Sequence, residues 1–266
     1  MASKNKRRDM VIPWPFAPSE TDLNKDTDLL KIIAMVCMFC DHAGKVLLPQ
    51  YPIMRVIGRL AFPIYAYCIA VGCIYTHDVF RYLKRLALVA IISQPIYCLA
   101  LEHASRAMFS ISFAEHPFRA AINFYVQSWH YPSIMLTLAF GLLVIWTIRE
   151  REMLLLISML LLCWWTQGKI NYGFRGIMLI VLFYLFSMKW WLSLPVVLAY
   201  MVWWGLRGSG YTLFEVRFGS QAFAILALPF IYIHMNTGIR VNKWFFYFFY
   251  PAHMVVIYFL KHFVLQ

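Results

Sequence analysis

Residues 29–49, LLKIIAMVCMFCDHAGKVLLP, combine the length of a membrane span with side chains that can transfer protons. A helix needs roughly 20 apolar residues to cross the hydrocarbon layer, and an ionisable residue inside such a helix is costly and usually functional. At 1.5 Å per residue, His42 lies about two thirds of the way across if the helix begins near Leu29. Because an imidazole beside a carboxylate suits acid–base catalysis, Asp41 and His42 form the first candidate site.

Two basic residues share this span. Lys31 precedes His42 by eleven positions, which is about 20° round a helix, so the two residues share one face. Lys45 follows Asp41 by one turn and can pair with it. A structural alternative stays open, in which Lys31 extends to the membrane surface and Asp41 caps or pairs near the far end of the helix.

Arg59 is the second signal. It belongs to a predicted second span over residues 53–76 and lies about as far from the turn at residues 49–52 as His42 does. An antiparallel hairpin therefore places Arg59 and His42 at similar depth on one polar cavity. Arg59 can pair with Asp41 or bind an anionic substrate group through two donors, and a buried pair that merely fixes the hairpin is the alternative.

His253 is the third candidate, near the middle of a predicted last span over residues 244–264. It follows Pro251 and Tyr250 closely. One reading is a hydrogen-bonded core histidine. Together with His42 and Arg59, however, His253 suggests a second polar wall of the same cavity.

Composition indicates an all-α, polytopic membrane helix bundle. The chain is 62% hydrophobic and 14% charged, with a mean hydropathy of +0.65. No polar interval is long enough for a soluble domain, so we expect a polar arm over residues 1–28 and a single transmembrane domain over residues 29–266. About nine spans are predicted: 29–49, 53–76, 86–101, 134–148, 153–167, 174–188, 190–206, 220–234 and 244–264.

The long interval between the third and fourth spans, residues 102–132, contains the mixed aromatic and polar stretch FRAAINFYVQSWHY, which predicts an interfacial amphipathic helix. The irregular spacing of His103, His116 and His130 favours interfacial roles and no metal site. Cys37 and Cys40 have CxxC spacing but lie on an apolar helix without a second ligand pair, so no metal is expected there either.

The net charge of +12 fits attraction to anionic membrane lipids better than nucleic-acid binding, since the bases lie in loops and at helix ends rather than in one aromatic patch. A modest excess of bases predicts a cytoplasmic N-terminal arm, and nine spans then place Gln266 outside. Asp22, Asp26 or Thr27 can cap the first span. The loop over residues 207–219 is expected to be irregular.

The chain resembles the TraX family of membrane acetyltransferases, typified by the enzyme that acetylates the N-terminus of F-type conjugative pilin. The matching stretches are LKIIAMVCMFCDHAG, RVIGRLAFPIYAY, LALVAIISQPIY, NYGFRGIMLI, QAFAILALPFIY and FFYFFYPAH. Asp-His followed by Gly-Arg-x-x-Phe-Pro is the most specific part. Asn171 and Ser133 depart from the residues that relatives often have, which affects the acceptor rather than the chemistry.

The resemblance implies a multi-pass inner-membrane enzyme that moves an acetyl group from cytoplasmic acetyl-CoA to an amine or hydroxyl, above all the N-terminus of a pilin-like protein. His42 would be the general base or a transient acetyl carrier, Asp41 would fix its tautomer, and Arg59 would hold a donor phosphate or polarise the thioester carbonyl. Substrate binding is assigned to Lys31, Arg55, Gln94, Asn171, Tyr172, Arg175, Tyr250 and His253.

Two other functions remain open. A proton-coupled transporter would use the same buried residues as a proton relay, but it would be expected to show an internal repeat, which the sequence lacks. A non-catalytic pilus or envelope assembly factor would not need ionisable groups buried at matching depth.

Overall fold

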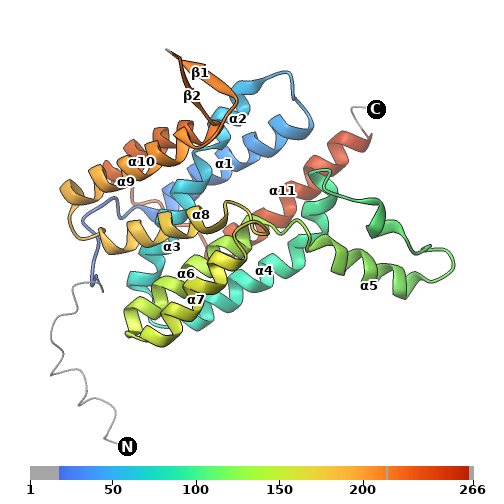
Figure 1. Cartoon of the computed structure of the whole chain (residues 1–266), viewed down its shortest axis with the longest axis horizontal. Helices are drawn as coiled ribbons and strands as arrows, with labels where there is room; N and C mark the ends of the chain where they lie inside the picture. The colour runs from blue at the N-terminus through green and yellow to red at the C-terminus, as the bar shows by residue number, and fades with distance from the viewer. Residues whose placement is uncertain (1–17, 214, 264–266) are drawn as a thin grey trace, which may run out of the picture.

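The computed structural model describes residues 18–213 and 215–263, and it confirms the predicted all-α class (Figure 1). The predicted cytoplasmic arm lies mostly outside the described residues. The α-helices are α1 (Thr27–Val46), α2 (Pro52–Gly58), α3 (Ala61–Tyr75), α4 (Val79–Ala100), α5 (Pro117–Ser128), α6 (Ile134–Glu150), α7 (Met153–Trp165), α8 (Gly173–Leu185), α9 (Trp190–Leu206), α10 (Leu228–Tyr232) and α11 (Lys243–Phe263). Two 3₁₀ helices, η1 (Arg106–Phe109) and η2 (Ser220–Ala227), and two strands, β1 (Tyr211–Leu213) and β2 (Val216–Phe218), complete the described elements.

The centre of the bundle is α3, which packs against α1, α6 and α8. Its sequence is apolar on every face, and a helix of that kind is stable only when it is surrounded. Tyr67, Ile69 and Ala70 are accordingly buried, and Phe183 of α8 packs edge-on against Tyr67. This central packing holds α1 in place, and with it the candidate residues Asp41 and His42.

The predicted second span is divided into α2 and α3 by Arg59 and Leu60. Pro63 explains the break, because it has no amide hydrogen with which to bond the carbonyl of Arg59 four residues earlier. Pro52 starts α2 at a position where its missing amide costs nothing. The hairpin of the first two predicted spans therefore carries Arg59 at a bend rather than inside a straight helix.

The third predicted span begins earlier than expected. The predicted span starts at Leu86, whereas α4 runs from Val79, and the side chain of Asp78 caps it by accepting a hydrogen bond from the Arg81 amide at 2.8 Å. Pro95 lies inside α4 as predicted. The polar residues of this segment therefore stand on the first turns of a helix.

The segment over residues 207–234 differs most from the prediction. The loop expected at residues 207–219 contains the antiparallel pair β1–β2, in which Tyr211 pairs with Phe218 and their rings stack at 5.7 Å. The regular helix expected at residues 220–234 is instead η2 followed by the short α10. Pro229 cannot donate to the carbonyl of Ile225, which removes one α-helical bond at this junction.

Apolar residues also cover much of the outside. The predicted amphipathic helix is present as α5, which projects from the bundle together with the segment before it (Figure 1). Phe118 of α5 is 77% exposed, and Leu154 of α7 is 80% exposed. Extensive exposed apolar surface commonly marks a face that contacts lipid or another protein.

Two stretches of the described residues are long and apolar enough to cross a membrane, Pro52–Tyr75 and Val79–Ala100. Shorter apolar helical stretches are Met153–Trp165, Gly173–Leu185, Trp190–Leu206 and Ser220–Tyr232. Since several of these are shorter than a full span, the number of nine spans stays a prediction.

Asp26 ties the start of α1 to the segment that leads into α11, and this contact generates a testable pH dependence. Its side chain accepts hydrogen bonds from the Leu29 amide at 3.5 Å, from the Thr237 amide at 2.8 Å and from the Thr237 hydroxyl. The bond from the Thr237 hydroxyl is the largest reason why the pKa of Asp26 lies below its ordinary value of 3.8. A carboxylate whose pKa is lowered by folding stabilises the fold at pH values above its unfolded-state pKa. This contribution to stability is lost as the pH falls below that value and through the folded-state pKa.

We therefore expect Asp26→Asn to lower the thermal midpoint of the detergent-solubilised chain at pH 7. Below about pH 4, the variant should lose less stability than the wild type does. Asp26→Ala should cost about 1 kcal/mol, as is common for a lost N-cap. Asp78→Asn at the N-cap of α4 is the control and should retain the wild-type loss on acidification. Identical acid profiles for the wild type and Asp26→Asn would contradict this account.

Candidate functional site

A polar cavity of about 400 Å³, called here the histidine cavity, opens where α1 ends and α2 begins. The end of α4 and the segments before α6 and α8 close its other sides. It brings together the predicted residues Asp41, His42, Arg55, Arg59, Asn171 and Tyr172. The predicted sharing of one cavity by His42 and Arg59 is confirmed.

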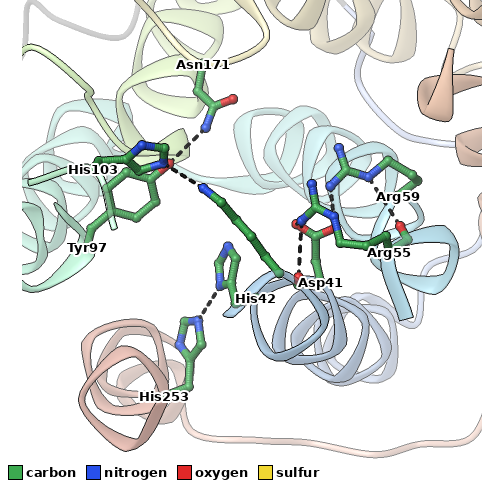
Figure 2. Close-up of polar contacts among 9 residues, drawn as sticks. Asp41, His42, Arg55, Arg59, Tyr97, His103, Asn171 and His253 are labelled. Atoms are coloured by element: carbon green, nitrogen blue, oxygen red, sulfur yellow. Dashed lines mark hydrogen bonds and ion pairs between the residues drawn. The ribbon is translucent and has the colours of Figure 1, made fainter. Parts of the chain in front are cut away.

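Asp41 bridges two arginines from the other arm of the hairpin (Figure 2). Arg55 Nη1 donates to Asp41 Oδ2 at 2.8 Å and to the Asp41 carbonyl at 3.1 Å, while Arg59 Nη2 pairs with Oδ1. The side chains of Asp41 and Arg59 are only 14% and 11% exposed. The predicted Asp41–Arg59 pair is thus confirmed and extended by Arg55.

Gly58 makes this ion cluster possible. A Cβ atom at Gly58 would overlap the Cβ and carboxylate of Asp41, so any other residue would push the carboxylate away from the arginines. A buried carboxylate that lost its partners would be strongly destabilising. The glycine in the motif Gly-Arg-x-x-Phe-Pro is therefore a packing requirement of the Asp41 site.

His42 contacts His253 of α11 rather than Asp41. The distance from His42 Nδ1 to His253 Nε2 is 3.0 Å, and the two rings stack with centroids 5.2 Å apart (Figure 2). Asp41 and His42 are consecutive on a helix, where neighbouring side chains diverge by about 100°, so they point to different partners. The tautomer-fixing contact that the sequence suggested for Asp41 is made by His253.

The hydrogen bonds define the proton positions on the two rings. His253 Nδ1 lies 2.9 Å from the carbonyl of Phe249, and a carbonyl can only accept, so Nδ1 carries a hydrogen. His42 and His253 are 9% and 3% exposed, which disfavours charge, and a neutral His253 then accepts at Nε2 from His42 Nδ1–H. Nε2 of His42 is left as an unprotonated base.

The opposite wall of the histidine cavity holds a residue that sequence reasoning placed elsewhere. His103 was expected to be interfacial, but it lies 3.0 Å from Lys45 Nζ and stacks on Tyr97 and Tyr131. Burial and the Lys45 charge lower the pKa of His103, so the neutral ring accepts a hydrogen bond from the ammonium. Lys45 therefore bonds to His103 instead of forming the close pair with Asp41 that helix spacing allowed.

Asn171 and Tyr172 reach the cavity from the segment before α8. Asn171 Nδ2 donates to the hydroxyl of Tyr97 at 3.2 Å, and Tyr172 stacks on Phe62 with ring centroids 4.2 Å apart. Tyr172 has a left-handed backbone with φ of 61°, which turns the chain into α8. Both predicted residues thus lie where a ligand can touch them.

The other residues assigned to substrate binding lie outside the histidine cavity. Gln94 is buried and holds the turn before α6, since it donates to the carbonyls of Ser128 and Tyr131 at 2.7 and 2.9 Å. The guanidinium of Arg175 lies 5.6 Å from the ring centroid of Trp203. Lys31 and Tyr250 line a second cavity, and His253 contacts the cavity residue His42.

The lining of the histidine cavity is strongly cationic. Lys45, Arg55, Arg59 and Lys169 face a single carboxylate, that of Asp41, among the described lining residues. Such a cavity stabilises anions, including a charge that develops during a reaction. Within residues 18–213 and 215–263, no group of three or more His, Cys, Asp and Glu side chains is arranged to hold a metal ion.

Comparison with known proteins gives two short matches to curated proteins. A segment of 40 residues, 15% of this chain, is 48% identical to 16% of an uncharacterized protein of Rickettsia prowazekii. A segment of 72 residues, 26% of this chain, is 32% identical to 30% of a probable fimbrial assembly protein, FimC of serogroup H1, from Dichelobacter nodosus. The chain thus covers less than a third of either relative, and no solved structure matches it.

The match to a family model is far more extensive than these two. The model described as TraX protein matches residues 26–261, which run from the N-cap of α1 to the last turn of α11. This range includes Asp41, His42, Arg59 and His253. The chain therefore belongs to the TraX family.

Proposed function

We propose that this protein is an integral membrane acetyltransferase that moves an acetyl group from acetyl-CoA to an amine or hydroxyl acceptor. Membership of the TraX family supports the reaction, because that family is associated with F-pilin acetylation. The observation that carries the proposal is the His42–His253 pair, which presents an unprotonated imidazole nitrogen at the wall of a cationic cavity.

In the proposed reaction, His42 Nε2 removes the proton from the acceptor as the acceptor nitrogen or oxygen attacks the thioester carbonyl. The new bond to the acetyl carbon forms, the carbon–sulfur bond breaks, and the proton passes from the imidazolium to the departing thiolate. A transient acetyl group on Nε2 is the alternative order of the same bond changes. Either route needs His42 Nδ1 to stay protonated, and in this proposal His253 keeps it so by accepting its hydrogen bond.

Cationic side chains assist this reaction in two ways. Arg59 would polarise the thioester carbonyl or hold a donor phosphate, since a guanidinium has five donors and Asp41 occupies only some of them. The surrounding charges of Lys45, Arg55 and Lys169 disfavour the ammonium form of an amine acceptor. A neutral amine is the form that can attack.

The acceptor we propose is the N-terminus of a pilin-like protein. The family association with F-pilin and the printed description of the Dichelobacter relative as a probable fimbrial assembly protein both point to surface fibres. That description also favours a second candidate, a non-catalytic assembly factor. Such a factor has no need of a buried histidine pair, so catalysis is the better reading.

We further propose that residues 29–266 form one multi-pass domain of the inner membrane, in contact with its lipids and with the N-terminus in the cytoplasm. The helix ends at Thr27 and Lys243 would then face the cytoplasm, and the histidine cavity would lie toward the outside. The acetyl group would thus cross much of the membrane before it reaches the acceptor.

Replacement of His42 by Gln tests the proposed base. Gln keeps a polar side chain but removes the basic ring nitrogen, so acetyl transfer from labelled acetyl-CoA should fall by about 10²- to 10⁴-fold with unchanged expression. The control is His262→Gln on α11, since His262 makes a similar contact to a backbone carbonyl at 3.0 Å without touching the histidine cavity. Normal transfer by His42→Gln would rule out His42 as the base.

Replacement of His253 by Phe tests the positioning role. A ring of similar shape remains, but the acceptor for His42 Nδ1–H is lost, so kcat should fall by about tenfold or more while KM changes little. The pH profile of kcat should also shift, because the His42 ring is no longer held in one tautomer. If kcat and its pH profile match those of the wild type, His253 is only a packed core histidine.

A further inference from the structure

A second cavity, called here the tyrosine cavity, lies at the other end of the bundle and has a volume of about 300 Å³. It is bounded by α1, α3, α4, α6 and α11, and its lining includes the start of α1 at Thr27 and the start of α11 at Lys243. Tyr65 lines this cavity and also the histidine cavity. A single side chain thus belongs to the walls of both.

Three cations enter the tyrosine cavity, and its described lining contains no carboxylate. They are Lys31, Arg85 and Lys243. Lys31 pairs at 3.0 Å with Asp28, which lies outside the lining. Among the residues that the structure describes, neither Arg85 nor Lys243 makes an ion pair. These unpaired charges at the mouth of the cavity suit an anionic ligand.

Aromatic rings surround these cations. Arg85 lies 5.8 Å from the ring centroid of Tyr82 and 6.0 Å from that of Tyr247, and Lys31 lies 5.1 Å from that of Phe246. Planar rings beside cations are a common way to bind a base and its phosphates together. The remaining lining is mostly aliphatic, with Ile69, Leu86 and Leu138 among its members.

The inner end of the tyrosine cavity reaches the catalytic pair. Tyr250 lines the cavity, precedes His253 by three residues, and its ring centroid lies 5.6 Å from that of His253. The Tyr250 side chain is 1% exposed, and its hydroxyl lies beside the buried hydroxyl of Ser133, where neither group makes a hydrogen bond of normal geometry. A pair of buried hydroxyls in that state retains hydrogen-bonding capacity that a polar ligand group can use.

We infer that the tyrosine cavity binds the donor, with the phosphorylated adenine nucleotide of coenzyme A at Lys31, Arg85 and Lys243. This inference rests on the proposed acetyltransferase function. Thr27 and His42 are fifteen residues apart on α1, or about 22 Å, so a ligand anchored at the mouth needs a long narrow arm to reach the base. The pantetheine arm runs along the aliphatic lining toward Tyr65 and Tyr250 and carries the thioester to His42.

This assignment separates the roles of the two cavities. The phosphates of the donor occupy the tyrosine cavity, which leaves Arg59 free to polarise the thioester carbonyl. The acceptor enters through the histidine cavity from the opposite end of the bundle. Tyr65 and Tyr250 stand where the two substrates meet.

Binding of unacetylated coenzyme A to the full chain in phosphatidylcholine nanodiscs, measured by calorimetry, tests the inference. We expect the Kd to rise at least tenfold in Arg85→Gln combined with Lys243→Gln, because two contacts between cations and phosphates are lost. Arg85→Lys should restore part of the affinity. Lys189→Gln is the control, since Lys189 lies over Trp191 and outside both cavities.

A second arm varies the ligand, so it does not depend on how a variant folds. The wild type should bind coenzyme A lacking its 3′-phosphate more weakly, and the double variant should discriminate less between the two ligands. If the wild type binds coenzyme A and the double variant binds it equally well, the inference fails while the proposed function stands. If the wild type does not bind coenzyme A at all, the proposed function itself fails.

A third arm separates coenzyme A from an anionic lipid headgroup as the occupant. The nanodiscs are prepared with phosphatidylglycerol in place of half of the phosphatidylcholine. The affinity for coenzyme A should change by the same factor in the wild type and in the control Lys189→Gln. The contradicting result is that phosphatidylglycerol abolishes coenzyme A binding by the wild type but has no such effect on the variant without Arg85 and Lys243. That result would assign the cavity to lipid and overturn the inference.

Discussion

The Asp41 carboxylate, buried between Arg55 and Arg59, is the interaction on which the candidate site depends. A largely buried carboxylate requires cationic partners, here Arg59 and the 36% exposed Arg55, and removal of a partner leaves charge uncompensated. This requirement fixes the angle between α1 and the bend that follows α2. It also explains why position 58 is a glycine, since a larger residue would occupy the space of the carboxylate.

Asp41 and His42 divide the structural and chemical roles between adjacent residues. Because neighbours on a helix face different directions, Asp41 joins α1 to the bend after α2, while His42 reaches α11. The packing that holds the arginines in place therefore also holds the His42 ring against His253. In our proposal, the stable ion cluster orients the base without sharing its proton.

Much of the fold follows from local sequence, and the failures have physical causes. Helices α6 and α9 begin at the predicted residues Ile134 and Trp190, since apolar runs between polar segments define them well. The start of α4 was missed because a cap at Asp78 outweighs the basic residues that follow. The β1–β2 hairpin was also missed, because its short strands lack an alternating pattern long enough to detect.

In the candidate site, too, some contacts could be predicted from the sequence and others could not. The Asp41–Arg59 pair could be predicted, because Arg59 and His42, the neighbour of Asp41, lie at equal distance from one turn. The His42–His253 contact joins residues 211 positions apart, and no spacing rule relates them. His103 lies before the amphipathic stretch of residues 118–131, in a part of the interval where no pattern predicts its position, so only its stacking on Tyr97 and Tyr131 shows that it enters the cavity.

The most direct test of the central claim is a sidedness experiment with the purified protein in sealed vesicles. Acetyl-CoA labelled in its acetyl group, which does not cross the bilayer, is supplied only on the side of Thr27 and Lys243, and a peptide with a pilin-like N-terminus is supplied only on the other side. The account predicts labelled acetyl groups on the peptide N-terminus and no labelling when the two sides are exchanged. Peptide that stays unlabelled in both arrangements, although the protein is folded and binds coenzyme A, would contradict transfer across the membrane.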